Sequence, residues 1–225
     1  EEWVTPIEIP LFDFRNEKGE MKIIKEGGSF QTSALRLEDE EGKEWVLRSL
    51  DKNASAVIPE NIRTGMAEDI VQDQMSASNP YGAFAVPGIA EAAGILHTNP
   101  RLVYLDIIYL PAGFSDKWEG IYLFEERPDG NRSDVASFGH SEKIVSTSTM
   151  IEKVTGKIDL RVDQKLFLKS RLVDMLISDW DRHEDQWRWA FFEENGSKVY
   201  KPVPRDRDMA FFVSEGVLPW LSTRK

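Results

Sequence analysis

The chain has 225 residues, of which 41% are hydrophobic, and its formal net charge is −11. This composition can build the core of one large domain or of two lobes. The negative charge argues against a general nucleic-acid or anionic-membrane surface, because both need a basic face. The absence of cysteine excludes disulfides, thiolate metal sites and cysteine nucleophiles. No apolar run approaches the roughly 18 residues that a membrane-spanning helix needs.

The N-terminal part alternates apolar and polar residues between turn signals, which predicts an antiparallel meander. Its expected strands are Ile7–Phe14, Met21–Lys25, Ser33–Leu37 and Glu44–Leu50. Helical spacing predicts a helix from Thr64 to Ser78. After Asn79-Pro80 a second helix is expected, interrupted near Pro87 and closed by Gly94.

Two further strands are expected at Leu102–Leu110 and Gly120–Glu126, because both segments are rich in β-branched and aromatic residues. The polar segment Arg127–Ser141 reads as a connection between two lobes. A short helix is then expected from Ser146 to Val154. A stronger helix is expected from Asp163 to Asp179, as a largely buried cylinder with apolar residues around it. The residues that suggest this cylinder are Leu166, Phe167, Ser170, Val173, Met175 and Ile177.

A hairpin follows, with strands at Trp187–Phe192 and Lys198–Val203 joined by the tight turn Glu194-Asn195-Gly196. Strands and helices segregate along the chain, so the predicted fold class is α+β with two lobes. The expected domains are an N-terminal lobe at 1–126, a linker at 127–141 and a C-terminal lobe at 142–225.

Two acid-rich segments, Asp181–Gln186 and Pro204–Phe211, flank the predicted hairpin. Several carboxylates aimed at one point would suit a divalent metal on a phosphate chain, with one carboxylate left to accept a proton from an attacking hydroxyl. As an alternative, each aspartate could cap a loop or pair with a nearby arginine, namely Arg182, Arg205 or Arg207. The three histidines lack metal-binding spacing and no Gly-x-Ser-x-Gly segment occurs, so neither a zinc site of the His-Glu-x-x-His kind nor a serine hydrolase is expected.

The segment Asp181-Arg182-His183, followed by two residues and an amide, together with an Asp-bearing turn after a hairpin, resembles an atypical protein-kinase-like superfamily. Its branches are HipA-type toxin kinases, CotH-type spore-coat kinases and secretory-pathway casein kinases. The resemblance is specific over residues 163–212. It implies a two-lobed fold with an antiparallel sheet in the N-lobe and a mainly helical C-lobe that carries a catalytic hairpin, here truncated.

Shorter segments resemble a bacterial family in which such a domain lies within much longer metallophosphoesterase-type proteins. They are Val46–Ser49, Asp69–Gln74 and Tyr122–Pro128. This resemblance implies an extracytoplasmic location, in the periplasm or at the outer membrane, with the cytoplasm as the alternative. Together with the abrupt chain ends it also predicts flanking domains.

The superfamily resemblance assigns roles within the acid-rich segments. It makes Asp181 the catalytic base, Asp206 a metal-binding aspartate and Asp208 a second one. Gln186 stands where the superfamily usually has a metal-binding asparagine, and because its side chain is longer, Asp185 is an alternative ligand. The implied cofactors are ATP with Mg²⁺ or Mn²⁺.

In the first lobe the resemblance implies a strand cation that holds the α- and β-phosphates and pairs with a helix acid. The matching strand offers Arg48, which can grip phosphate bidentately, and Asp69 or Asp73 is the expected partner. A phosphate-covering loop is expected at Gly27, Gly28 and Ser29. The segment Tyr122–Glu126, which includes Glu125, is expected beside the adenine. A plain turn would also explain the glycine pair, and a buried edge strand would also explain Tyr122–Glu126.

The sequence therefore supports two hypotheses from different classes. The first is a phosphotransferase that moves the γ-phosphate of ATP to an unknown hydroxyl acceptor. The second is a catalytically inactive pseudokinase or ligand-binding module of a larger envelope-associated protein, which Arg48 and Gln186 favour because both depart from the usual kinase residues. Metal-assisted hydrolysis of a phosphoester by the same carboxylates is a weaker third idea. No nucleic-acid partner is expected.

Overall fold

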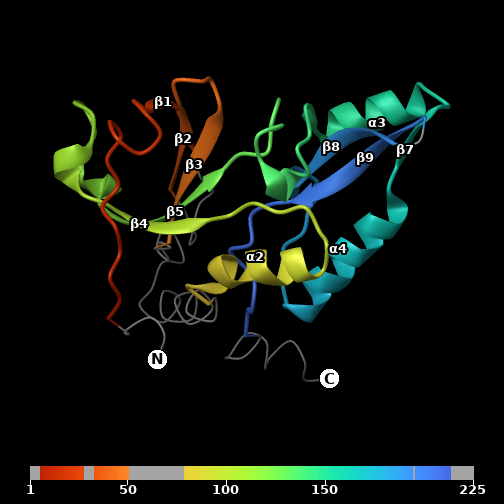
Figure 1. Ribbon diagram of the computed structural model, residues 1–225. Coiled ribbons are helices and arrows are strands. Elements are labelled where there is room, and N and C mark those ends of the chain that lie inside the picture. The colour runs from red at the N-terminus through yellow and green to blue at the C-terminus, as the bar shows by residue number, and fades with distance from the viewer. Residues whose placement is uncertain (1–5, 28–32, 51–78, 195, 214–225) are drawn as a thin grey trace, which may run out of the picture. The chain divides into compact units, whose positions relative to one another are not determined.

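The computed structural model of the chain describes residues 6–27, 33–50, 79–194 and 196–213. These residues divide into two compact units. The first unit contains the described residues within 1–80 and 100–125, together with Phe212 and Val213, and the second contains Tyr81–Asn99 and Glu126–Phe211. Each unit has its own β-sheet (Figure 1), and the predicted α+β class is confirmed.

The sheet of the first unit has the strand order β1-β2-β3-β5-β4. Its strands are β1 (Lys22–Gly27), β2 (Ala34–Glu38), β3 (Glu44–Ser49), β4 (Arg101–Leu105) and β5 (Gly120–Glu126). The pairs β1–β2, β2–β3 and β4–β5 are antiparallel. The predicted meander is therefore confirmed for β1 to β3, and β5 has the predicted bounds.

Alternation along the strands builds the core of this first sheet. Leu35 and Leu37 of β2 are fully buried, because residues two apart in a strand face the same side. Trp45 of β3 stacks on Phe124 of β5, with 5.0 Å between ring centroids and an interplanar angle of 12°. The turn between β2 and β3 is fixed by Asp39, whose carboxylate accepts a hydrogen bond from the Trp45 indole at 2.8 Å.

The strand predicted at Ile7–Phe14 is wrong. The main chain of Phe12 donates to the carbonyl oxygen of Tyr104 in β4 at 2.8 Å, but these described residues form no strand. The chain turns away immediately afterwards, because the carbonyl oxygen of Asp13 accepts from the main-chain N–H of Asn16 at 3.1 Å. Phe12 and Phe14 of this segment belong to the core of the first unit instead, whereas Ile7 and Leu11 are exposed.

The sheet of the second unit has the strand order β6-β8-β9-β7. Its strands are β6 (Ile144–Ser146), β7 (Leu160–Val162), β8 (Trp187–Glu194) and β9 (Ser197–Pro204). The antiparallel pair β8–β9 is the predicted hairpin, which is confirmed. The sequence does not predict β6, antiparallel to β8, or β7, parallel to β9, because strands of three residues are too short to show alternation.

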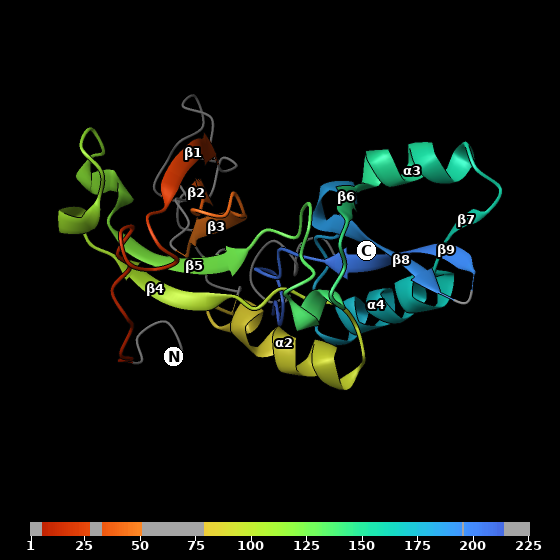
Figure 2. The same ribbon diagram turned by 45° about the horizontal axis from the view of Figure 1, so that its top comes forward.

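Helix α4 (Gln164–Leu176) lies along the β8–β9 hairpin (Figures 1 and 2). The hairpin carries an apolar cluster on each of its faces. On one face Trp187 and Trp189 contact Phe167 of helix α4, with ring centroids 4.8 and 5.7 Å from that of the phenylalanine. On the opposite face Phe138 packs against Ala190. This double burial fixes the register of the hairpin, since a slip of one residue would exchange the two clusters.

Polar side chains cap the starts of two helices in this unit. Ser146 accepts from the amide of Thr149 at 3.2 Å at the start of α3 (Thr147–Thr155). Asp163 accepts from the amide of Leu166 at 2.9 Å at the start of α4. Both caps satisfy N–H groups that the helix itself leaves unpaired, so both helices begin where the sequence predicts.

Helix α2 (Gly82–Ala92) differs from the prediction, because it continues through Pro87 without interruption. It ends as expected before Gly94, whose φ of 62° is the left-handed conformation that glycine favours. The buried side chains of α2 pack with residues of α4 and of the chain after β9, namely Val173, Ile177 and Ala210. This packing places α2 in the second unit, whereas the sequence had assigned it to the first lobe.

Helix α4 is not the buried cylinder that the sequence predicts. Val173 and Asp174 are buried, but the Met175 side chain is 72% exposed. The helix therefore has one buried and one exposed face, and the exposed face carries several large apolar residues.

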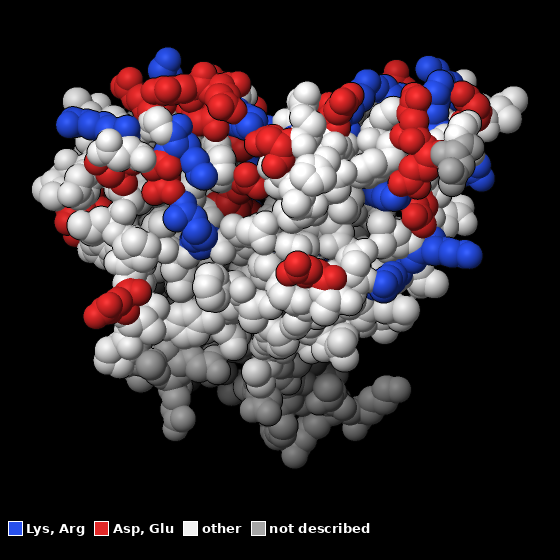
Figure 3. All heavy atoms as spheres, in the orientation of Figure 1, with Lys and Arg blue, Asp and Glu red and all other residues white. Residues whose placement is uncertain are grey.

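On the face that Figure 3 shows, carboxylate side chains gather over β1 to β3, with basic side chains beside them. Among the described residues, no helix combines the length and the apolar character that crossing a bilayer requires.

Candidate functional site

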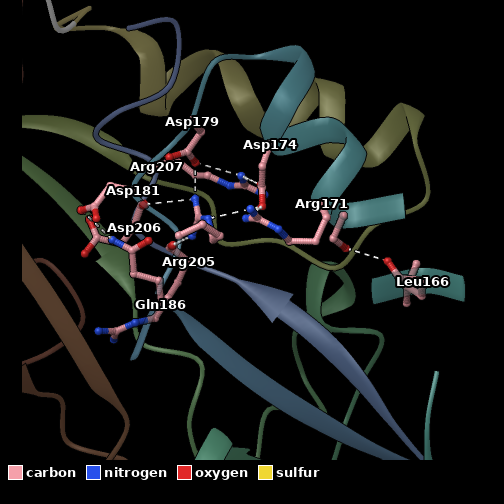
Figure 4. Close-up of polar contacts among 11 residues, drawn as sticks. Leu166, Arg171, Asp174, Asp179, Asp181, Gln186, Arg205, Asp206 and Arg207 are labelled. Atoms are coloured by element: carbon pink, nitrogen blue, oxygen red, sulfur yellow. Dashed lines mark hydrogen bonds and ion pairs between the residues drawn. The ribbon is translucent and has the colours of Figure 1, made fainter. Parts of the chain in front are cut away.

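The two acid-rich segments lie at one end of the β8–β9 hairpin. Trp187, the first residue of β8, is the register partner of Pro204, the last residue of β9. The amide of Arg205 extends the pairing by donating to the carbonyl oxygen of Gln186 at 3.1 Å. The loop before β8 and the loop after β9 are therefore neighbours (Figure 4).

Asp181 and Gln186 form a polar pair within the first of these loops. The Gln186 amide nitrogen donates to the Asp181 carboxylate at 3.3 Å, and Gln186 is only 3% exposed. No hydrogen-bond donor of the described residues reaches the other end of this amide, the buried oxygen Oε1. A buried carbonyl oxygen without a donor costs about 1–3 kcal/mol. Amide carbonyl oxygens and carboxylates are both ligands that Mg²⁺ and Ca²⁺ use.

The loop after β9 holds Asp206 in an unusual backbone conformation. Its φ is 62°, in the left-handed region that few residues other than glycine occupy. Arg182 anchors this stretch, because its guanidinium donates to the carbonyl oxygens of Arg205 at 2.5 Å and Asp206 at 3.4 Å. The Arg182 side chain of the loop before β8 therefore fixes the backbone of the loop after β9. Left-handed conformations like that of Asp206 are enriched at functional sites.

The remaining predicted metal ligands are less closely gathered. Asp208 is half-buried in the turn that follows Arg207, and Asp185 is exposed in the 3₁₀ turn Glu184–Gln186. Within the described ranges, no group of three or more carboxylate or imidazole side chains surrounds a single point that could hold a metal ion. A cation here would have to use the Gln186 carbonyl, one or two carboxylates and oxygens of a substrate or of water, which is a common arrangement for Mg²⁺.

A buried network of charged side chains lies beneath the two loops (Figure 4). Arg207 contacts Asp174, and it contacts Asp179 at 2.9 Å. Arg182 contacts Asp179 as well, and its Nε lies 3.5 Å from Asp174. Arg171 adds a contact of 2.8 Å to Asp174. The network joins α4 to both loops.

Burial dominates the electrostatics of this network. It raises the pKa of Asp179 above the usual value, although Arg182 and Arg207 both act in the opposite direction. Burial also lowers the pKa of Arg182, and the neighbouring charge of Arg207 adds to that effect. Burial of these charges therefore costs free energy of folding, and removal of any one member would leave its partner as an uncompensated buried charge.

The sequence did not identify the acidic members of this network, Asp174 and Asp179. Asp174 lies four residues after the buried Ser170 and three before the buried Ile177, so helical spacing marks it as an inward-facing charge. That signal was available in the sequence. The sequence suggests Arg182 and Arg207 only as alternative partners of the loop aspartates, and it does not predict their contacts with Asp174 and Asp179.

The first unit contains the predicted phosphate-binding arginine. Arg48 of β3 lies 3.8 Å from the carboxylate of Glu125 on the adjacent strand β5, with side chains that are 17% and 10% exposed. Gly27 ends β1 opposite Ala34. The other predicted residues of this group lie outside the described residues: Gly28, Ser29, Asp69 and Asp73.

The structure thus brings together Asp181, Gln186 and the Asp206 loop within the second unit, and Arg48 with Glu125 within the first. Convergence of these two groups on one ligand stays a prediction. Comparison of the chain with protein-family models, with curated proteins and with solved structures found no match.

Proposed function

We propose that this chain is a metal-dependent phosphotransferase of atypical kinase-like fold, which transfers the γ-phosphate of ATP to a hydroxyl acceptor. Asp181 orients the acceptor hydroxyl and takes its proton. The carbonyl oxygen of Gln186 and the carboxylate of Asp206, with Asp208 as a further candidate, hold Mg²⁺ or Mn²⁺ on the phosphates. Arg48 of β3 is the candidate cation for the phosphate chain.

The observation that carries this proposal is the meeting of the two acid-rich loops at one end of the hairpin, where the Gln186 amide nitrogen contacts the Asp181 carboxylate and the Arg205 amide donates to the Gln186 carbonyl oxygen of the main chain. The side-chain oxygen of Gln186 accepts no hydrogen bond from the described residues, so it is available to a cation. The adjacent loop supplies Asp206 at the same end of the hairpin. Phosphoryl transfer needs little more than metal ligands and a positioned proton acceptor, because positioning and charge stabilisation provide most of the catalysis.

The test is release of ADP from ATP in the presence of Mn²⁺, with and without generic hydroxyl acceptors such as casein and glycerol. We expect Asp181→Asn and Asp206→Asn to abolish turnover while the far-ultraviolet circular dichroism spectrum stays unchanged. Glu184→Gln is the matched control, because Glu184 is an exposed acid of the same loop with no role in the proposed site. Turnover that survives both aspartate substitutions would disprove the assignment.

One observation favours an inactive nucleotide-binding module as the second candidate. Arg48 stands at the expected lysine position and is paired with Glu125. This alternative predicts that ATP with Mn²⁺ raises the melting temperature, that no ADP is released, and that Asp181→Asn leaves the shift unchanged. Hydrolysis of p-nitrophenyl phosphate without any nucleotide would instead indicate a metal-assisted phosphoesterase.

A further inference from the structure

The exposed face of α4 is apolar. Four large side chains lie on it, with exposed fractions of 59% for Leu168, 56% for Leu172, 72% for Met175 and 77% for Leu176. Their spacing of four, three and one residues places them on a single side of the helix. We call these four residues the α4 stripe. Isolated exposed leucines are ordinary, but a continuous stripe on one helix is typical of an interaction surface.

The opposite face of α4 is already occupied within the second unit. Val173 packs with Ile177 and α2, and Phe167 packs on Trp187 and Trp189 of the hairpin. The α4 stripe therefore cannot turn inward by rotation of the helix, because rotation would expose Val173 and the buried charge of Asp174. The stripe is a fixed feature of the surface.

The exposed charged side chains that α4 itself carries are all basic. Lys165 and Lys169 are exposed on this face of the helix, and the side chain of Arg171, at its margin, is 36% exposed. Asp174, the acidic residue of α4, is fully buried. In a chain with a net charge of −11, this helix presents a basic and apolar surface.

We propose that the α4 stripe docks an amphipathic helix of a partner protein, with an apolar side and acidic flanks. A stripe with helical spacing fits the ridges of a second helix, and the basic margin fits acidic flanks. An anionic membrane surface would also match the stripe locally. A membrane fits less well than a partner helix, because the large negative net charge of the chain repels anionic lipid. This proposal is independent of the phosphotransferase proposal.

The test uses two designed helical peptides of about 20 residues, a length at which helices become stable enough to study. Both carry leucines with the spacing of the α4 stripe, flanked by glutamate in one peptide and by lysine in the other. Isothermal titration calorimetry should show binding of the acidic peptide only. Leu172→Asp should weaken that binding about tenfold or more, as expected for a central contact. Ile158→Asp is the matched control, since Ile158 is fully exposed outside α4.

Charge reversal tests the flanks separately. The double variant Lys165→Glu with Lys169→Glu should lose the acidic peptide and gain the basic one. The proposal is overturned if neither peptide binds at millimolar concentration, if both bind equally to the unmodified chain, or if Leu172→Asp has no effect. It is also overturned if the stripe instead mediates self-association in sedimentation experiments or binding to phosphatidylserine vesicles.

Discussion

Arg182 donates a hydrogen bond of 2.5 Å to the carbonyl oxygen of Arg205. This bond fastens the loop before β8 to the loop after β9, and the same guanidinium also contacts the buried Asp179. The Arg182 side chain therefore holds the backbone of the loop after β9 and also neutralises the buried carboxylate of Asp179.

Loss of this guanidinium should be strongly destabilising. Arg182→Met keeps a similar volume but leaves buried carboxylates with fewer partners, which should lower the free energy of unfolding by about 3–5 kcal/mol. Arg161→Met is the control, because Arg161 is exposed and its bond to Ser197 lies at the surface, so a change below about 1 kcal/mol is expected. Urea denaturation measures both values, and equal effects would contradict the role of the network.

The raised pKa of Asp179 makes its contribution to stability depend on pH. A carboxyl group whose pKa is higher in the folded than in the unfolded state binds protons more tightly when folded. Its stabilising effect is then complete below the unfolded pKa of about 3.9 and is lost as the pH rises through the folded value.

The comparison of the unmodified chain with Asp179→Asn isolates this effect, because the amide does not titrate. The variant should be least stable relative to the unmodified chain near pH 3.5, and the difference should shrink as the pH approaches 7. Urea denaturation at several pH values gives the difference directly. A difference that grows toward neutral pH would show that the arginines outweigh burial.

Gln186 should separate metal binding from stability. Gln186→Leu removes a buried oxygen that has no donor among the described residues, so the free energy of unfolding should change by less than about 1.5 kcal/mol. The same variant should weaken Mn²⁺ binding about tenfold or more, and Gln186→Glu should restore it. Electron paramagnetic resonance of Mn²⁺ measures the affinity, and an unchanged affinity in Gln186→Leu would remove Gln186 from the site.

Two glycines of α2 offer a test of how closely this helix approaches the loop after β9. A Cβ atom at Gly82 would lie 2.3 Å from the carbonyl oxygen of Ala210, whereas a Cβ atom at Gly88 would meet nothing within 4 Å. Gly82→Ala should destabilise the chain by about 1–3 kcal/mol, because backbone must move. Gly88→Ala should stabilise it by about 0.5–1 kcal/mol, because alanine favours the helix. Thermal denaturation of the two variants should therefore shift in opposite directions.

The hairpin with its acidic loops could be predicted because its signals are local. Alternation marks both strands, the segment ending in Gly196 marks the turn, and antiparallel pairing then places Asp181–Gln186 beside Arg205–Ala210. The three-residue strands β6 and β7 could not be predicted in the same way, since their pairing is determined by distant segments.

The charged contacts were harder to predict for a similar reason. The pair Arg48–Glu125 depends on the adjacency of β3 and β5, which are far apart in the sequence. Charged residues are usually expected at the surface, so the sequence did not lead to a prediction that Asp174 is buried. Its helical spacing from Ser170 and Ile177 nevertheless indicates an inward-facing position. Apolar spacing alone also misjudged α4, because Met175 and its neighbours are apolar without being buried.

The register of the β8–β9 hairpin determines how the loop before β8 and the loop after β9 are aligned. Both strands have eight residues, and Trp187 faces Pro204 only if every intermediate pair is kept. Lengthening the chain at the tip, next to Gly196, leaves that alignment intact. One extra residue inside either strand would turn every later side chain to the opposite face. Length changes at the tip therefore leave the two loops aligned, whereas an insertion within either strand displaces them unless a bulge absorbs it.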